Sequence, residues 1–549
     1  MKHWLVALLS CLALAGLYLL YWNHAEYVID DWGHYLFYQR AAGGGLAARW
    51  EVLRGLFDSR LYGGYQLFWL SQWMNCLLVV WPFGYSPKAA FVTLVLLHAI
   101  NSWLFYLLLD RLGVGRRLAY FTAACLVVIP SAHGPLFWAL NCSFFVWPMF
   151  FLLLYLLVTQ RALAAGWVSA RAAAASVVLI LAVLFAGSPA AVVLLVAAPW
   201  TALCFFGRRR RQTGLIVALL LGAAVPAGLE FYQRTRYRHR LAPAKRFRWN
   251  LPMLAANAYT TVADLGKLSG VARSSYYDIW KSPAAIGAGL AAALLVAAAS
   301  RRLANQGERQ PAWRIALYAA GMGLAAYAPM AVLNSKGLRH YYTFSPFLAL
   351  LLLLPARRLG LAWGAAWCGC FAAGAVGEIR QCWIPQSQAH QRFKQAIVEV
   401  DNLDPGDWVV APGVELLRGT APAFALGGPP WDARFVQVVT GVAGLEFARE
   451  VVVEQGRLRL YHRHKMSDLT PAELARLHVL APDATGRYAR RRYLAWEQEA
   501  GRFLLVPLKG SAPPPSGDQL LTREQLAPHL GQVHFPKPFE HGNPQLSEY

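Results

Sequence analysis

The stretch WLVALLSCLALAGLYLLYW, residues 4–22, decides the fold class, because it carries no charged residue and is long enough to cross a bilayer. Apolar runs of this kind recur through the first 380 residues, in a chain that is 57% hydrophobic with mean hydropathy +0.35. The first run extends past a secretory signal and lacks a small-residue cleavage site, so we expect a retained helix. The sequence therefore predicts an all-α polytopic membrane protein.

About eleven transmembrane helices are expected from the hydropathy pattern. The segment Gln66–Pro82 is apolar as well, but Gln72, Asn75 and its aromatic residues suit a helix lying in the membrane interface. The expected spans cover residues 4–22, 88–109, 118–131, 143–159, 172–187, 190–206, 213–230, 283–300, 313–333, 341–355 and 360–376.

Charge in the short loops predicts the orientation. On one face these loops carry fifteen arginines against two acids, Asp110 and Glu308, which places that face and the N-terminus in the cytoplasm. The loops 23–87 and 231–282, and the chain beyond about Gln381, then face outward. We expect a multi-pass protein of the bacterial inner (plasma) membrane.

The composition changes to that of a water-soluble domain from Gln386 onward. The expected organisation is a transmembrane domain over 1–380 and a small extracytoplasmic α/β domain over 386–549, loosely ordered from about 510. The expected elements are a helix over Ser387–Asn402, strands at Trp408–Ala411 and Phe435–Val439, a hairpin over Glu450–Tyr461, a helix beginning at Thr470, and strands at 477–481 and 502–507.

Motif absences narrow the function classes. Nucleotide-binding, zinc-hydrolase and serine-hydrolase signatures do not occur in a suitable context. Most of the eight cysteines lie within expected spans, which does not suggest a disulfide framework. Cys368 and Cys370 lie in an apolar run without His or carboxylate neighbours, so packing explains them better than a metal does.

Several short motifs follow one another along the chain: Asp30-Asp31-Trp32 at the start of the first outer loop, Tyr65 in the interfacial stretch, LHAINSWLFY at 97–106, IPSAH at 129–133 followed by Trp138 and Asn141, and LRHYYTFSP at 338–346. Their order resembles the GT-C superfamily of integral membrane glycosyltransferases, nearest to the protein O-mannosyltransferase-like and tetratricopeptide-repeat membrane mannosyltransferase branch. The resemblance covers about residues 1–376. It implies transfer of a sugar from a polyprenyl-phosphate donor to an acceptor on the non-cytoplasmic face, with a first-loop acid as base.

Two departures from the family pattern keep a second function class open. The chain has Tyr65-Gln66-Leu67 where relatives usually show Arg-Pro after a Tyr, and the hairpin 187–190 lacks an acid often found there. These departures favour a non-catalytic glycan or lipid-linked oligosaccharide transport or assembly factor. The Asp pair and Arg339 favour a transferase acting on a glycolipid, polysaccharide or protein of the cell envelope.

The chemistry of glycosyl transfer points to specific residues. A base must take the hydroxyl proton, and one of Asp30 and Asp31 could do so, with the other orienting it; a solvated loop turn explains the pair otherwise. Asp31, directly before Trp32, best matches the second acid of the family motif. Donor-phosphate candidates are Arg339, Lys336, His340 and His133, whose alternatives are helix-end anchoring for the cations and a buried structural role for His133.

Other polar residues have less specific roles. His98 and Asn101, one turn apart in mid-span, are better explained by interhelical hydrogen bonds than by a site. His34 could join the two acids around a divalent metal, but three ligands are a thin set and the metal stays open. The basic outer loop, with Arg246 and Arg248, suits acceptor or anionic-lipid binding. The expected partners are a polyprenyl-phosphate-linked sugar, an envelope acceptor and membrane lipids, with no nucleic acid.

Overall fold

The structure is a computed structural model in which the following residues are described: 2–27, 44–51, 69–137, 143–186, 191–207, 282–303, 309–331, 341–399, 403–410, 431–448 and the strands 450–454, 457–462, 465–468, 477–482, 488–490, 493–497, 502–506 and 520–522. The chain divides into two compact units. The helical unit comprises residues 1–25 and 37–379, and the C-terminal unit comprises 26–36 and 380–549.

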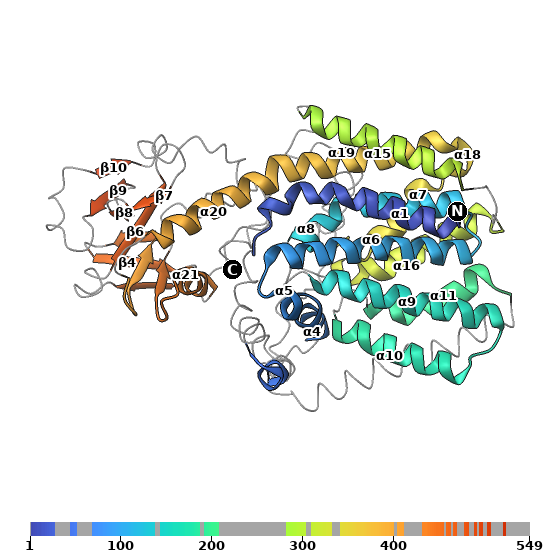
Figure 1. Cartoon of the computed structure of the whole chain (residues 1–549), viewed down its shortest axis with the longest axis horizontal. Coiled ribbons are helices and arrows are strands. Elements are labelled where there is room, and N and C mark those ends of the chain that lie inside the picture. The colour runs from blue at the N-terminus through green and yellow to red at the C-terminus, as the bar shows by residue number, and fades with distance from the viewer. Residues whose placement is uncertain are drawn as a thin grey trace. The chain divides into compact units, whose positions relative to one another are not determined.

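The helical unit is built from helices that run beside one another (Figure 1). Four helical stretches are long and apolar enough to cross a membrane: His3–His24, Pro87–Arg111, Ser143–Ala165 and Pro283–Arg301. Most expected spans on described residues coincide with a helix, but the span 118–131 is broken and the span 341–355 holds only the short helix Ser345–Leu353. The range 213–230 lies outside the described residues, so the count of eleven stays a prediction. The main helices are α1 (His3–Ala15) with the 3-10 helix η1 (Gly16–His24), α6 (Pro87–Arg111), α7 (Arg116–Val127), α9 (Ser143–Ala165), α10 (Ala170–Ala186), α11 (Ala191–Phe205), α15 (Pro283–Arg301), α16 (Ala312–Ala331), α17 (Ser345–Leu353), α18 (Ala356–Leu359) and α19 (Leu361–Glu378).

The predicted single span 118–131 is instead a broken helix. Helix α7 ends at Val127, and the 3-10 turn η6 (Pro130–Ala132) leads into α8 (His133–Phe137) at an angle of 47°. Pro130 has no N–H and its ring crowds the preceding turn, so a straight helix cannot continue through it. The break leaves the carbonyl of Val127 to side chains: it accepts hydrogen bonds from Tyr18 Oη at 2.8 Å and His98 Nε2 at 2.9 Å.

A short helical segment made of α4 (Trp69–Asn75), the π-helix η5 (Cys76–Val80) and α5 (Trp81–Phe83) crosses the direction of the other helices, and Figure 1 shows it nearly end-on. Its polar side chains are buried and bonded to neighbouring helices. Ser71 Oγ donates to the carbonyl of Ala186 at 2.6 Å, and Asn75 Nδ2 donates to Ser143 Oγ at 2.9 Å. These bonds explain the amide and hydroxyl groups in an otherwise apolar run. Its position in the membrane interface remains a prediction.

The turns that carry the arginines meet at one end of the helical unit, here named the arginine end and defined by residues 111–117, 301–303, 309–310 and 357–358. Arg117 Nε donates to the carbonyl of Leu303 at 3.1 Å. The backbone N–H of Arg309 donates to Gly113 O at 3.0 Å, and Arg357 Nη1 donates to Gln310 O at 3.0 Å. Loops far apart in sequence therefore share one end, as a multi-span bundle with these short loops on one side requires.

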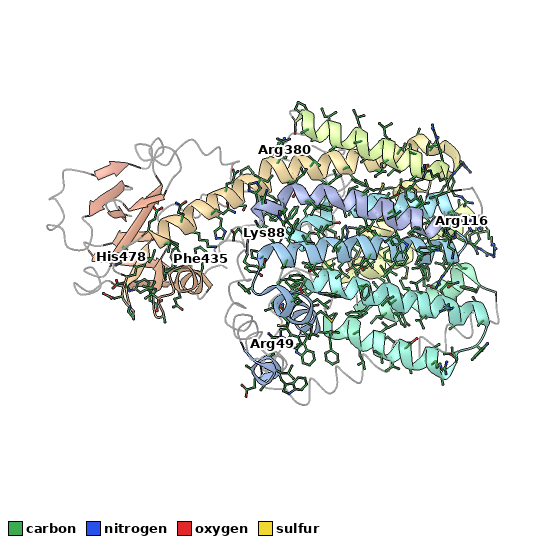
Figure 2. The ribbon with its side chains drawn as sticks, in the orientation of Figure 1. Arg49, Lys88, Arg116, Arg380, Phe435 and His478 are labelled. Carbon is green, nitrogen blue, oxygen red and sulfur yellow. The ribbon has the colours of Figure 1, made fainter. Side chains whose placement is uncertain are left out.

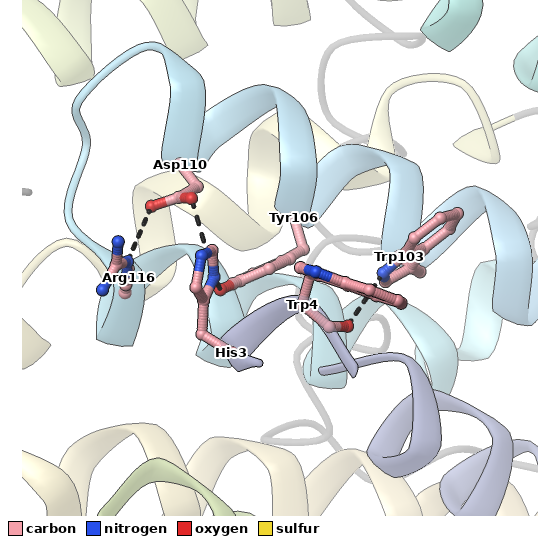
Figure 3. A network of polar contacts seen from close by, with 6 residues as sticks. All are labelled: His3, Trp4, Trp103, Tyr106, Asp110 and Arg116. Atoms are coloured by element: carbon pink, nitrogen blue, oxygen red, sulfur yellow. Dashed lines mark hydrogen bonds and ion pairs between the residues drawn. The ribbon is translucent and has the colours of Figure 1, made fainter. Parts of the chain in front are cut away.

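The N-terminus is fixed to the arginine end by a polar network (Figure 3). His3 Nδ1 lies 2.8 Å from Tyr106 Oη and 3.8 Å from Asp110 Oδ2, and Arg116 Nε lies 3.4 Å from Asp110 Oδ1. Figure 2 shows Lys88, at the start of α6, at the end of the helical unit opposite Arg116. Helices α1 and α6 thus run antiparallel, with the start of α1 beside the end of α6.

Helices α15 and α19 approach closely through glycines. A Cβ placed on Gly289 would lie 2.7 Å from the carbonyl oxygen of Gly369 and 2.9 Å from Ala373 Cβ. A Cβ on Gly369 would lie 2.9 Å from Gly289 O and 3.1 Å from Ala293 Cβ. Small residues at such positions let helix backbones pack directly, which is typical of membrane helices.

The C-terminal unit combines α20 (Ile384–Val398) and α21 (Trp431–Thr440) with two sheets. One sheet has the order β2-β1-β6-β7, and β1 pairs in parallel with both β2 and β6. The other has the order β10-β9-β8-β3-β4-β5, antiparallel except for β3 with β8. The strands are β1 (Trp408–Val410), β2 (Glu446–Ala448), β3 (Glu450–Glu454), β4 (Arg457–His462), β5 (Lys465–Asp468), β6 (Leu477–Pro482), β7 (Tyr488–Arg490), β8 (Tyr493–Glu497), β9 (Arg502–Val506) and β10 (Leu520–Thr522).

One element of this unit differs from the expectation. The predicted hairpin is present, with Glu454 opposite Arg457, but the predicted strand Phe435–Val439 is part of helix α21. Its apolar residues follow a helical spacing: Phe435 and Val436 are buried, and Thr440 Oγ1 donates to the carbonyl of Val436 at 2.8 Å. A short apolar run does not distinguish strand from helix by its own pattern. The helix expected from Thr470 begins outside the described residues.

Candidate functional site

Most of the predicted site residues lie outside the part of the chain that the structure describes. This holds for the two acids of the first loop, the cations and histidine of the late motif, and the basic residues of the long outer loop: Asp30, Asp31, His34, Lys336, Arg339, His340, Arg246 and Arg248. Their proposed roles stay predictions. His133 is the predicted site residue that the structure does place, and it leads to a cluster of buried polar groups.

His133 forms a buried pair with Glu378. Its side chain is 1% exposed, and Nδ1 makes a short hydrogen bond to Glu378 Oε2. The two residues are far apart in sequence: His133 begins α8, just after the helix break, and Glu378 ends α19. Ionisable side chains in an apolar helical bundle are costly to bury and usually serve a function, with a partner that compensates them. His133 and Glu378 meet this description.

His98 is a second buried histidine near the helix break, and it makes the interhelical hydrogen bonds expected from the sequence. Its Nε2 bonds to the carbonyl of Val127, and its Nδ1 lies 2.7 Å from Tyr342 Oη. Because Nε2 faces a carbonyl, it carries the hydrogen, and Nδ1 then accepts from the tyrosine hydroxyl. Asn101, one turn further along α6, donates from Nδ2 to the carbonyl of Val146 at 3.0 Å. Both side chains hold α6 against its neighbours.

Tyr18 joins the two histidines. Its ring packs edge-on against His98, with centroids 6.4 Å apart, and against His133 at 5.7 Å. A hydroxyl pair lies beside the same break, where Ser131 Oγ is 2.5 Å from Ser345 Oγ. We name these residues the broken-helix cluster: Tyr18, His98, Ser131, His133, Tyr342, Ser345 and Glu378. All seven side chains are buried.

The cluster lies in the half of the helical unit away from the arginine end. Helix α7 starts there with Arg116 and reaches the cluster at its last residue, and α19 starts just after Arg358 and reaches it at Glu378. The first span likewise begins beside Asp110 and contributes Tyr18 late in its length. These helices thus reach one level of the unit, where α7 supplies the carbonyl of Val127 and the other two supply the side chains of Glu378 and Tyr18.

The chemistry available to this cluster is hydrogen bonding and proton transfer. Among the described residues, groups of three or more His, Cys, Asp or Glu that could hold a metal ion are absent. The pair of His133 and Glu378 can hold a proton between Nδ1 and Oε2, and His133 Nε2 has no hydrogen-bond partner within the described ranges. The second nitrogen of the imidazole is therefore the group to which a ligand could bind.

Glu378 was not singled out from the sequence. The last span was expected to end at residue 376, which placed this acid just beyond the membrane, where a carboxylate needs no explanation. The structure continues α19 to residue 378 and buries the side chain. The signal available in the sequence was a single carboxylate at the end of an apolar run.

Comparison with known proteins adds no assignment, because no protein-family model matches the chain and no curated protein matches its sequence.

Proposed function

We propose that the protein is a GT-C-type membrane glycosyltransferase that moves a sugar from a polyprenyl-phosphate donor to a cell-envelope acceptor. The observation that carries the proposal is the buried pair of His133 and Glu378 in the half of the helical unit opposite the arginine end. Two ionisable groups held inside an apolar bundle are a functional arrangement by default. The order of the motifs from Asp30 to Pro346 supplies the reaction class.

The proposed orientation follows from the arginine end. Placing it in the cytoplasm of a plasma membrane satisfies the positive-inside rule, and the N-terminus then lies there too. The broken-helix cluster falls in the outer half of the membrane. Asp30 and Asp31, the late motif and the C-terminal unit fall on the extracytoplasmic side, where lipid-linked sugars are used.

The proposed reaction has three participants. The acceptor hydroxyl loses its proton to Asp30 or Asp31 while its oxygen forms a bond to the anomeric carbon. The bond from that carbon to the phosphate oxygen breaks, and the polyprenyl phosphate leaves with the electron pair. Arg339, Lys336 and His340 would stabilise the negative charge that develops on the phosphate.

The test is transfer by membranes that contain equal amounts of folded protein. We expect Asp30→Asn or Asp31→Asn to lower the rate by about 10²- to 10⁴-fold, as loss of a positioned base does. Glu51→Gln is a matched control, because Glu51 is an exposed acid of the same loop. Near wild-type transfer in both aspartate variants would refute the mechanism.

A second function is favoured by a specific observation. Gln66-Leu67 stands where relatives usually have Arg-Pro, which suits a glycan transport or assembly factor that keeps the fold without the chemistry. Such a protein would still bind lipid-linked glycan. Mass spectrometry of envelope glycans separates the two: a transferase mutant lacks one sugar, whereas a transport mutant accumulates a complete lipid-linked glycan.

A further inference from the structure

The proton arrangement of the His133 and Glu378 pair is constrained by its burial. The imidazole is 1% exposed and the carboxylate side chain 9% exposed, so the surroundings disfavour a net charge on the pair. A net-neutral pair exists in two forms. Either the carboxylate is ionised and both ring nitrogens carry hydrogens, or the carboxyl is protonated and donates to Nδ1, which leaves the ring hydrogen on Nε2.

Both net-neutral forms have a hydrogen on Nε2. Only an ionised Glu378 beside a neutral His133 would leave Nε2 as an acceptor, and that form buries an uncompensated negative charge. A ring N–H that is buried needs an acceptor, since an unsatisfied polar group costs about 1–3 kcal/mol. Across the described ranges Nε2 has no hydrogen-bond partner.

We infer that His133 Nε2 is a fixed hydrogen-bond donor for an anionic oxygen of a polyprenyl phosphate, with Glu378 as the positioning residue. This inference rests on the proposed function for the ligand and on the geometry for the donor. An anionic oxygen is the acceptor favoured here, because a hydrogen bond from an N–H group to an ionised oxygen is stronger than one to a neutral oxygen. Glu378 would contribute by holding the ring orientation and the proton on the pair, as carboxylates do for other functional imidazoles.

Two aromatic side chains flank the ring of His133. The ring packs edge-on against Tyr18, and its centroid is 5.6 Å from that of Phe137. These two contacts and the hydrogen bond to Glu378 restrict the ring to one orientation, so Nε2 has a fixed direction. The phosphate would bind in the outer half of the membrane, at the level where the headgroup of a polyprenyl phosphate lies.

Two substitutions separate the ring nitrogens. In His133→Asn the amide nitrogen replaces Nδ1 and can still bond Glu378, but nothing replaces Nε2. In His133→Gln the amide nitrogen reaches the position of Nε2 and the bond to Glu378 is lost. A hydrogen bond to a charged group contributes about 1.5–3 kcal/mol, so we expect His133→Asn to raise the Kd for a polyprenyl phosphate by roughly 10- to 100-fold. His133→Gln should stay within a few-fold of wild type.

The measurement uses the full-length protein in phosphatidylcholine nanodiscs, titrated with a long-chain polyprenyl phosphate. The matching polyprenol and a phosphatidic acid serve as the other two probes. Equal binding of the polyprenol would overturn a phosphate contact, and equal binding of phosphatidic acid would overturn the polyprenyl source. An unchanged Kd in His133→Asn, or equal losses in both variants at wild-type melting temperature, would overturn the assignment of Nε2.

A wild-type experiment covers the case in which both variants fail to fold. A polyprenyl phosphate with a photoreactive group next to the phosphate should cross-link to the peptide 130–137, and labelling confined to other segments would overturn the inference. Failure of this inference can be distinguished from failure of the proposed glycosyltransferase activity. Nε2-dependent binding without sugar transfer supports this inference and refutes the enzyme, whereas transfer with Nε2-independent binding does the reverse.

Discussion

Substituting alanine for Gly289 tests the close approach of α15 and α19 without reference to function. The added Cβ would lie 2.7 Å from Gly369 O and 2.9 Å from Ala373 Cβ. Neither neighbour is the end of a flexible side chain, so the helices must move apart along their contact. Overpacking of this kind costs about 1–3 kcal/mol.

Gly287→Ala is the matched control on the same helix. A Cβ there meets no atom within 4 Å, and the position is exposed. Replacing a helical glycine by alanine gains up to about 1 kcal/mol of helix propensity. The same gain applies at Gly289, so we expect Gly289→Ala to lose about 1 kcal/mol net, and at most about 2 kcal/mol. Gly287→Ala should be neutral or more stable by up to about 1 kcal/mol.

The assay is reversible unfolding in mixed micelles by titration with a denaturing detergent, followed by the helical circular dichroism signal. Each variant adds one methyl group to the same helix, at positions about half a turn apart. Composition and helix propensity are therefore the same in the two variants. A Gly289→Ala protein as stable as Gly287→Ala would refute the described packing of α15 on α19.

Two further predictions concern the C-terminal unit and the orientation. Burial, and to a smaller extent the charge of Lys394, lower the pKa of His390 to about 3 in the folded unit. In the unfolded chain His390 takes up a proton below about pH 6.5, so this unit should lose stability as the pH falls from 6.5. At pH 5.5 this loss should be about 1.4 kcal/mol, measured by pulse proteolysis of the full-length protein. The variant His390→Phe keeps a ring against Phe435 and should not show the loss. If that variant keeps the pH profile of the wild type, His390 is not the cause. For the orientation, a chain with its native cysteines replaced should show Cys at Arg171 protected from an impermeant maleimide in intact cells and Cys at Ser467 labelled, and the opposite pattern would reverse the topology.

The apolar runs predicted the positions of the helices well, because capping or charged residues in the sequence mark where a run begins and ends. Helix α6 was expected over 88–109 and occupies Pro87–Arg111: Ser86 caps its start, accepting from Ala89 N at 3.3 Å, and Asp110 and Arg111 end its apolar length. The broken helix was missed because Pro130 was taken as the end of a span rather than its interior. Whether a proline ends or bends a helix depends on partners for the freed carbonyl, and here these come from other helices.

The cluster was less accessible to sequence reasoning than the helices were. His98 and His133 could be noticed as polar residues in apolar runs, but their partners Tyr342 and Glu378 are more than 240 positions away from them. Composition and spacing do not report contacts at such separations. The prediction of a strand at Phe435–Val439 failed for a local reason, because a short segment with four apolar residues suits either a strand or a helix face until the packing of Phe435 is known.

The shared carbonyl of Val127 bears on the order in which the protein is made. Tyr18 and His98, its two donors, are synthesised before it, so the break that follows α7 can be fixed as soon as the segment 116–137 leaves the ribosome. Tyr342 and Glu378 are synthesised long afterwards, and until they arrive His98 Nδ1 and His133 Nδ1 lack these partners. Domains form from the N-terminus as the chain emerges. Biogenesis would therefore build the scaffold early and close the polar cluster only with the last helices, so a truncated chain would insert in the membrane with its candidate site unfinished.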